Sequence, residues 1–146
     1  MTDATWPARM QRLKNGPLVE SAPNVELWLD GGHNSAAAVA IADLLGTLPN
    51  RETHLICGML NTKDVSGYMK PLAEHVSQLT AVGIPGEINT LPSDVTAQAA
   101  RDAGMAAEEA GSVQEALNVI SKTSPNARVL ICGSLYLAGY VLRENS

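Results

Sequence analysis

Short apolar runs alternate with longer segments rich in alanine and leucine along most of this chain. The runs that end at Asp30, Gly58, Val82 and Gly133 contain few polar residues, and residues 105–107 form a weaker one. Nearly unbroken apolar runs are typical of strands in a sheet that is covered on both faces. They predict strands over residues 25–30, 54–58, 78–82, 105–107 and 128–133.

Helical segments are predicted between these strands and after the last one. Alanine, leucine and isoleucine dominate residues 35–48, where Asp43 is the only charge, and Pro49 ends the segment. Asp64 stands where an N-cap is expected, and Ser112 begins a capping-box pattern. The predicted helices span residues 35–48, 64–76, 92–102, 112–121 and 135–143.

Strands that alternate with helices from residue 25 onward predict one α/β domain. We expect a Rossmann-like open, mainly parallel sheet with helices on both faces. Residues 1–16 are expected to form an N-terminal arm. Residues 17–20, the turn at 21–24 and the strand at 25–30 are expected to form an N-terminal antiparallel hairpin.

Composition and charge exclude several classes of function. Hydrophobic residues make up 45% of the 146 positions, but aromatic residues only 3%, and phenylalanine is absent. The core must therefore consist of leucine, valine, isoleucine, alanine and methionine. The formal charge is -5 and the basic residues are scattered. Nucleic-acid binding normally needs a clustered basic surface, so we predict no nucleic-acid partner, while a small anionic ligand remains possible.

The chain has neither a run long enough to span a bilayer nor the pattern of a secretory signal. We therefore expect a cytoplasmic protein without membrane association. Cys57 and Cys132 lie inside apolar strands, and no further Cys or His stands at ligand spacing. Reduced, buried thiols are predicted, and no metal site.

The strongest candidate site follows the strand at 25–30, in the loop Asp30-Gly31-Gly32-His33-Asn34. Ligands of open α/β sheets lie at such strand ends, beside a helix N-terminus. Asp30 can accept hydrogen bonds from a ribose, and His33 and Asn34 add donors. A purely structural alternative is equally open, in which Asn34 caps the helix and Asp30 braces the loop.

Two further loops are predicted at the same edge of the sheet. The segments 55–60 and 130–135 are nearly identical, Leu-Ile-Cys-Gly-Met-Leu and Leu-Ile-Cys-Gly-Ser-Leu, and each passes from a strand through glycine into a loop. Lys63 can meet a carboxylate or phosphate in one loop, and Ser134 can bind an anion in the other. Taken alone, helix capping by Asp64 and Ser134 is the simpler interpretation.

Several common catalytic patterns are absent from the sequence. It contains no Gly-x-Ser-x-Gly nucleophile motif, no dinucleotide-binding glycine pattern and no phosphate-binding P-loop. The chain therefore lacks the usual means to hold a triphosphate by itself. We expect structural or surface roles for His54 and His75, which have no partner at useful spacing.

Four segments, in this order, resemble the C-terminal domain of folylpolyglutamate synthase/dihydrofolate synthase, a branch of the Mur ligase superfamily. The resemblance covers nearly the whole chain. It departs from the family pattern at Ala8, where glycine is usual, and at Ser35, where proline is usual. The matching segments are Trp6-Pro7-Ala8-Arg9, Asp30-Gly31-Gly32-His33-Asn34-Ser35, the Gly58 to Asp64 loop, and Gly133-Ser134-Leu135-Tyr136-Leu137-Ala138-Gly139.

The resemblance implies an ATP-dependent amide ligase. Such an enzyme phosphorylates the γ-carboxylate of a folate glutamate tail, and the amine of L-glutamate then attacks the acyl phosphate. ATP and Mg would be held mainly by an N-terminal ATPase domain that this chain lacks, so we expect a fragment that is inactive alone and binds neither by itself. The implied site residues are His33 as catalytic, Arg9, Asp30 and Asn34 for the nucleotide, and Ser134 and Lys63 for glutamate.

Two alternatives remain at this point. The chain can belong to a muropeptide ligase of the same superfamily, although the Trp6 arm and the segment 133–139 favour the folate branch. It can also be a stand-alone α/β binding or regulatory module. Asp30 and Lys63 faintly resemble a receiver domain, but that domain's acidic partners are absent, and the scarcity of aromatic residues argues against a flavin site.

Overall fold

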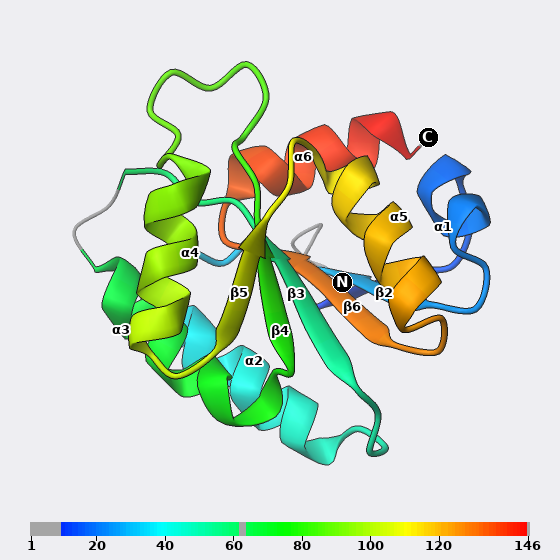
Figure 1. Ribbon diagram of the computed structural model, residues 1–146, viewed down its shortest axis with the longest axis horizontal. Helices are drawn as coiled ribbons and strands as arrows, with labels where there is room; N and C mark the ends of the chain where they lie inside the picture. The colour runs from blue at the N-terminus through cyan, green and yellow to red at the C-terminus, as the bar shows by residue number, and fades with distance from the viewer. Residues whose placement is uncertain (1–9, 62–63, 146) are drawn as a thin grey trace, which may run out of the picture.

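The computed structural model describes residues 10–61 and 64–145, which fold around one mixed sheet (Figure 1). Six strands lie in the order β1-β2-β6-β3-β4-β5, and all neighbouring pairs are parallel except β1 with β2. The expected open, mainly parallel sheet is thereby confirmed. The strands are β1 (Gln11–Leu13), β2 (Glu26–Leu29), β3 (Thr53–Cys57), β4 (Gln78–Ala81), β5 (Ala106–Glu109) and β6 (Arg128–Cys132).

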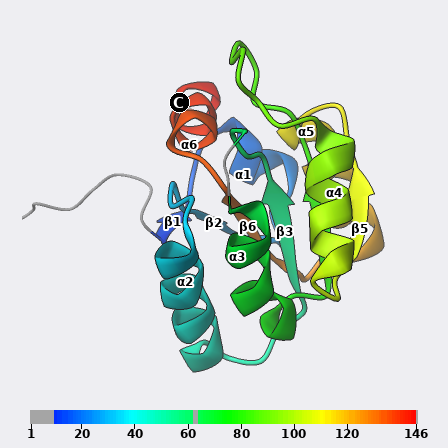
Figure 2. The same ribbon diagram turned by 90° about the vertical axis from the view of Figure 1, so that its left-hand side faces the viewer.

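Helices cover both faces of the sheet, as Figure 2 shows from the side. On β3, Leu55 and Cys57 pack toward the face of α2, α3 and α4, whereas Ile56 packs toward the face of α1, α5 and α6. Both faces of the strand are buried, which explains the apolar residues 55–57 at its carboxyl end. The helices are α1 (Pro17–Ser21), α2 (Ser35–Thr47), α3 (Val65–Met69), α4 (Ser93–Asp102), α5 (Val113–Thr123) and α6 (Leu135–Glu144), with the 3-10 helix η1 (Lys70–His75).

The expected strand at residues 17–20 is wrong, because this segment forms the short helix α1. Gly16 has a φ of 106°, and Pro17 follows it at the start of the helix, where proline fits well. The backbone N–H of Leu18 donates to Asn145 Oδ1 at 2.9 Å, and the Leu18 side chain is buried. A contact with a residue 127 positions away therefore stabilises the helix, and no local pattern reveals it.

The N-terminal antiparallel pair is nevertheless present, with a different first strand. β1 (Gln11–Leu13) pairs with β2, placing Leu13 opposite Leu27 and Arg12 opposite Trp28. The guanidinium carbon of Arg12 lies 5.9 Å from the centre of the Trp28 ring. This edge strand falls inside the segment expected to be an arm.

The remaining helices and strands agree with the sequence prediction apart from their ends. The helix predicted over 64–76 is divided, because α3 ends at Met69 and η1 continues to His75. Pro71 lacks the N–H that an α-helix would need to bond the preceding turn. Asp64 caps α3 by accepting from Gly67 N at 3.0 Å, as predicted. In the described part of the chain, no helix is long and apolar enough to cross a membrane.

Candidate functional site

The carboxyl ends of β2, β6 and β3 lie side by side and place three loops at one edge of the sheet. Asp30 N donates to Ile131 O at 2.9 Å, and Gly58 N donates to Cys132 O at 3.1 Å. The prediction of a common edge is thus confirmed for the loops after these strands. We call this region the loop edge and define it as residues 30–34, 58–61 and 133–136.

The carboxylate of Asp30 organises the first of these loops. It is only 5% exposed; Oδ1 accepts from Gly32 N at 2.7 Å and Oδ2 from Met10 N at 3.0 Å. The predicted bracing role is therefore confirmed, and it extends to the residue before β1. A carboxylate oxygen can accept more than one hydrogen bond.

His33 and Asn34 follow at the N-terminus of α2. Asn34 Oδ1 accepts from Ala37 N at 2.9 Å, which confirms the predicted cap. This bond uses the amide oxygen, and the amide nitrogen has no partner among residues 10–61 and 64–145. His33 is exposed. Both side chains therefore present donors at a helix N-terminus, where an anion is favoured.

The turn at Gly133 is in contact with the turn at Gly58. Gly133 has a φ of 110°, and a Cβ added there would lie 2.7 Å from the carbonyl oxygen of Gly58. Ser134 is 2% exposed, and its Oγ accepts from Tyr136 N at 3.0 Å, which confirms its capping of α6. A Cβ added at Gly31 would lie 2.7 Å from Leu135 Cδ2. The three loops thus form one packed unit.

Two predicted site residues, Arg9 and Lys63, lie outside the described residues. The structure brings together the other four, because the loops that carry Asp30, His33, Asn34 and Ser134 share one edge. The predicted ligand-binding roles of all six residues stay predictions.

Two cysteines and a tyrosine are buried together next to the turns at Gly58 and Gly133. Cys57 and Cys132 are free, buried and directly opposite each other on β3 and β6, as expected for reduced thiols. Hydrogen bonding with Cys132, together with burial, raises the pKa of the Cys57 thiol well above its usual range. Burial likewise raises the pKa of Tyr68, whose ring is fully buried in the same cluster. The Cys57 thiol and the Tyr68 hydroxyl are therefore neutral at pH 7.

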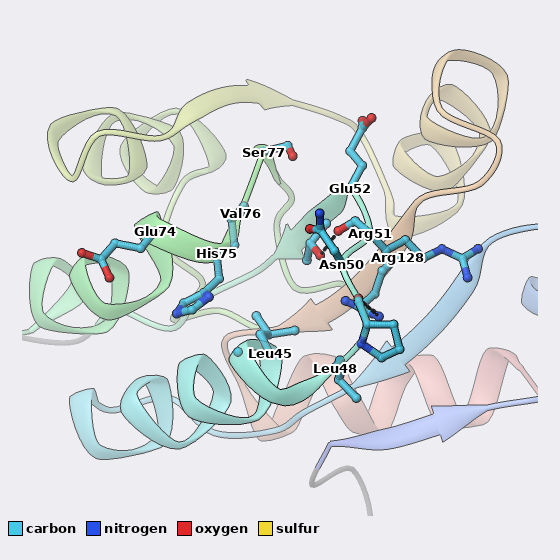
Figure 3. A pocket seen from close by; sticks show the side chains of 13 residues that line it. Leu45, Leu48, Asn50, Arg51, Glu52, Glu74, His75, Val76, Ser77 and Arg128 are labelled. Atoms are coloured by element: carbon cyan, nitrogen blue, oxygen red, sulfur yellow. Dashed lines mark hydrogen bonds between the residues drawn. The ribbon is translucent and has the colours of Figure 1, made fainter.

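A hollow of about 500 Å³ opens at the opposite edge of the sheet, between the end of α2, the end of η1 and the start of β3 (Figure 3). None of the predicted site residues lines it. His75 does, whereas His54 is buried and bonds to the carboxylate of Glu52. The expectation that His54 lacks a partner at useful spacing is therefore wrong, whereas its burial agrees with the expected structural role. Across the described ranges, no cluster of three His, Cys, Asp or Glu side chains is placed to hold a metal ion.

Residues 14–144 match the family model described as "Dihydrofolate synthetase, C-terminal domain". The chain belongs to this family. A curated relative, the folylpolyglutamate synthase of Lacticaseibacillus casei, is 30% identical over 140 residues. That match covers 93% of this chain but 29% of the relative. The domain therefore spans less than a third of the length of this enzyme.

Solved structures show the same fold. A Mycobacterium tuberculosis folylpolyglutamate synthase complexed with ADP aligns with a TM-score of 0.79 at 24% identity, covering 95% of this domain and 32% of that chain. A bifunctional folylpolyglutamate synthase/dihydrofolate synthase from Yersinia pestis, complexed with AMPPNP and Mn ion, aligns at 0.73 with 23% identity, covering 96% and 31%. At these identities the likeness supports the architecture alone.

Proposed function

We propose that this domain is the C-terminal part of an ATP-dependent ligase that adds glutamate to the γ-carboxylate of folates through an acyl-phosphate intermediate. Membership of the dihydrofolate synthetase C-terminal family carries the proposal. The packed loop edge supports it, because open α/β sheets hold ligands at the carboxyl ends of their strands.

The domain is proposed to supply half of the active site. Its sequence lacks a P-loop, and its described residues offer no cluster of metal ligands. By resemblance to the family, ATP, Mg and most of the folate are assigned to the part of the enzyme that precedes this domain. When bound, ATP activates the folate carboxylate by phosphorylation. The domain by itself is expected to lack ligase activity.

The residues of the loop edge fit the nucleotide side of this proposal. Asp30 is assigned to a ribose hydroxyl, because it lies at the end of β2 and a carboxylate oxygen can accept more than one hydrogen bond. The amide nitrogen of Asn34 is available to donate, and Arg9 is assigned to the phosphates by resemblance alone. His33 is exposed and is assigned a catalytic role near the reacting groups.

The glutamate side of the proposal rests on Ser134 and Lys63. The Ser134 oxygen accepts from the backbone of α6, so its hydroxyl hydrogen remains available to a carboxylate. Such a bond would fix the incoming amino acid at the N-terminus of a ten-residue helix. The Lys63 ammonium is proposed to pair with the same substrate.

The test uses the full-length enzyme and measures release of ADP that depends on folate and glutamate. Ser134→Ala should raise the KM for glutamate about tenfold, the loss expected for one hydrogen bond to a charged group. Ser112→Ala is the matched control, because Ser112 caps α5 through Glu115 N at 3.1 Å. It removes an equivalent cap and should leave this KM unchanged.

His33→Ala tests the catalytic assignment. The side chain is exposed, so folding should be unaffected while kcat falls. An unchanged kcat would show that His33 has no catalytic role. Equal KM values for glutamate in the Ser134→Ala and Ser112→Ala variants would show that Ser134 does not bind glutamate. If the full-length enzyme releases no ADP in response to folate and glutamate, the proposed function itself is wrong.

A further inference from the structure

The chain between β4 and α4 leaves the sheet as a projecting loop, residues 83–91, which we call the Ile88 loop (Figure 1). Its two ends are buried, with Ile84 3% and Leu91 8% exposed. Ile88, near the middle, is 93% exposed, the largest exposed fraction of any large hydrophobic side chain in the described residues. An isoleucine held in solvent gives up the favourable free energy of burial.

Hydrogen bonds hold the loop in one shape. Thr90 Oγ1 accepts from Ile84 N at 2.9 Å and so joins the two ends of the loop. Within it, Glu87 N donates to Ile84 O at 3.2 Å. Gly86 makes the turn with a φ of 76°, a conformation that suits glycine. The hydrogen bonds of the loop thus hold Ile88 in its exposed position.

The same loop is attached to the loop edge. Leu91 N donates to Met59 O and Asn61 N donates to Asn89 O, both at 2.8 Å, so the two segments run antiparallel. A Cβ added at Gly58 would lie 3.3 Å from Ile84 Cγ1. The Ile88 loop therefore lies beside the candidate site and braces residues 59–61 of the loop edge.

The family and the length of its members indicate what covers Ile88. This domain spans 29% of the Lacticaseibacillus casei relative, and the family model is that of a C-terminal domain. The rest of such an enzyme, about seven-tenths of its length, must meet the loop edge if the two parts share ATP. Glu87 is the only charged residue of the loop, so its tip suits an apolar surface.

We propose that the Ile88 loop is a docking element, whose Ile88 side chain packs into an apolar recess on the part of the enzyme that precedes this domain. The inference rests on the proposed function, because it assumes that this domain is joined to such a part. Docking there would also fix the position of residues 58–61 of the loop edge.

The test measures how fast maleimide labels a cysteine at two positions of the full-length enzyme, without turnover. Ile88→Cys probes the loop, and Val119→Cys is the control, since Val119 is 59% exposed on α5. Peptide mass spectrometry reads each site separately, and the native Cys57 and Cys132 are buried. In this domain as described, Ile88 is the more exposed of the two positions, so it should label faster if nothing covers it.

The proposal expects the Ile88→Cys thiol to label at least fivefold more slowly than the Val119→Cys thiol, independently of protein concentration. Any smaller difference overturns it. Protection that disappears on dilution also overturns it, because the loop then contacts a second copy. Labelling needs no catalysis, so this result stays separate from the ADP-release assay, whose failure would refute the proposed function.

A second variant measures the consequence for activity. Ile88→Asp should lower kcat/KM for ligation about tenfold or more, because a carboxylate opposes burial in an apolar recess. Val119→Asp should leave it unchanged. Equal activity of Ile88→Asp and Val119→Asp would contradict the docking role. Equal unfolding midpoints of the two variants would show that a loss of activity in Ile88→Asp does not come from misfolding.

Discussion

Replacing Glu26 with leucine should destabilise the domain through an ion pair at the edge opposite the candidate site. Glu26 Oε2 accepts from Arg128 Nε at 2.6 Å, and Oε1 accepts from Arg51 at 3.3 Å. The side chains of Arg128 and Glu26 are only 4% and 14% exposed. The substitution leaves the Arg128 guanidinium buried without its counter-charge.

The magnitude follows from the burial of each partner. Breaking a buried ion pair from one side costs about 3–5 kcal/mol, and the residual exposure of Glu26 places this case near 3 kcal/mol. Arg51 is 32% exposed, so its lost pairing adds less than about 1 kcal/mol. For a chain of this size, the unfolding midpoint should fall by roughly 6–12 °C.

Urea and thermal unfolding of the domain, followed by circular dichroism at pH 7, measure this change. Glu108→Leu is the control, because Glu108 is exposed on β5, and it should shift stability by less than about 0.5 kcal/mol. The double variant Glu26→Leu/Arg128→Met should be more stable than Glu26→Leu, since it buries no unpaired charge. A loss below about 1 kcal/mol for Glu26→Leu would refute the reasoning.

The same ion pair predicts how stability depends on pH. Burial alone would raise the pKa of Glu26, but hydrogen bonds from Arg128 and Trp28 outweigh it and hold the pKa below the usual 4.5. A carboxylate with a depressed pKa stabilises the fold at pH values above its unfolded pKa. This contribution should be lost as the pH falls below about 4.5 through the folded pKa, and Glu26→Leu should lose less stability over that range.

Three further predictions concern the glycine turn, a second carboxylate and the buried thiols. Gly133→Ala should lower the free energy of unfolding by about 2 kcal/mol or more, because it combines a positive φ with a clash against the Gly58 carbonyl. Gly104→Ala, with a φ of 100° and no atom within 4 Å, should cost only about 1 kcal/mol, and equal costs by urea unfolding would contradict the clash. Hydrogen bonds from His54 and Ser124 lower the pKa of Glu52, so Glu52→Gln should flatten the loss of stability below about pH 4.5 in a pH series of melts. Cys57 and Cys132 should react with a thiol reagent only when the domain unfolds, because both are buried. Rapid labelling of the native domain would show that solvent reaches these thiols in the folded state.

The sequence alone was enough for most of the helices and strands, because each is encoded by a local pattern. An apolar run such as residues 55–57 of β3 indicates burial on both faces of the sheet. Asp64 and Ser112 each mark a helix start, because their side chains accept from a backbone N–H three residues ahead. The same reasoning placed the candidate loops at strand ends. Chain direction in a parallel sheet then required them to share an edge.

Tertiary structure decided the features that depend on residues far apart in the chain. The helix at residues 17–21 is held by a bond from Leu18 N to Asn145 Oδ1, and Met10 N, next to β1, donates to Asp30 in the candidate loop. Glu26 and Arg128 meet although they are 102 positions apart. No periodicity records such contacts, since they arise only when the strand order brings their elements together.

The loop edge combines both kinds of information. Local pattern was enough to identify Asp30, Asn34 and Ser134 as residues at strand ends that can cap or bind. Only the order β2-β6-β3 brought their loops into contact, and only the bonds from residues 89–91 to residues 59–61 showed that the Ile88 loop belongs to the same surface. Helix and strand signals act over a few residues, whereas the packing of one loop on another depends on the whole chain.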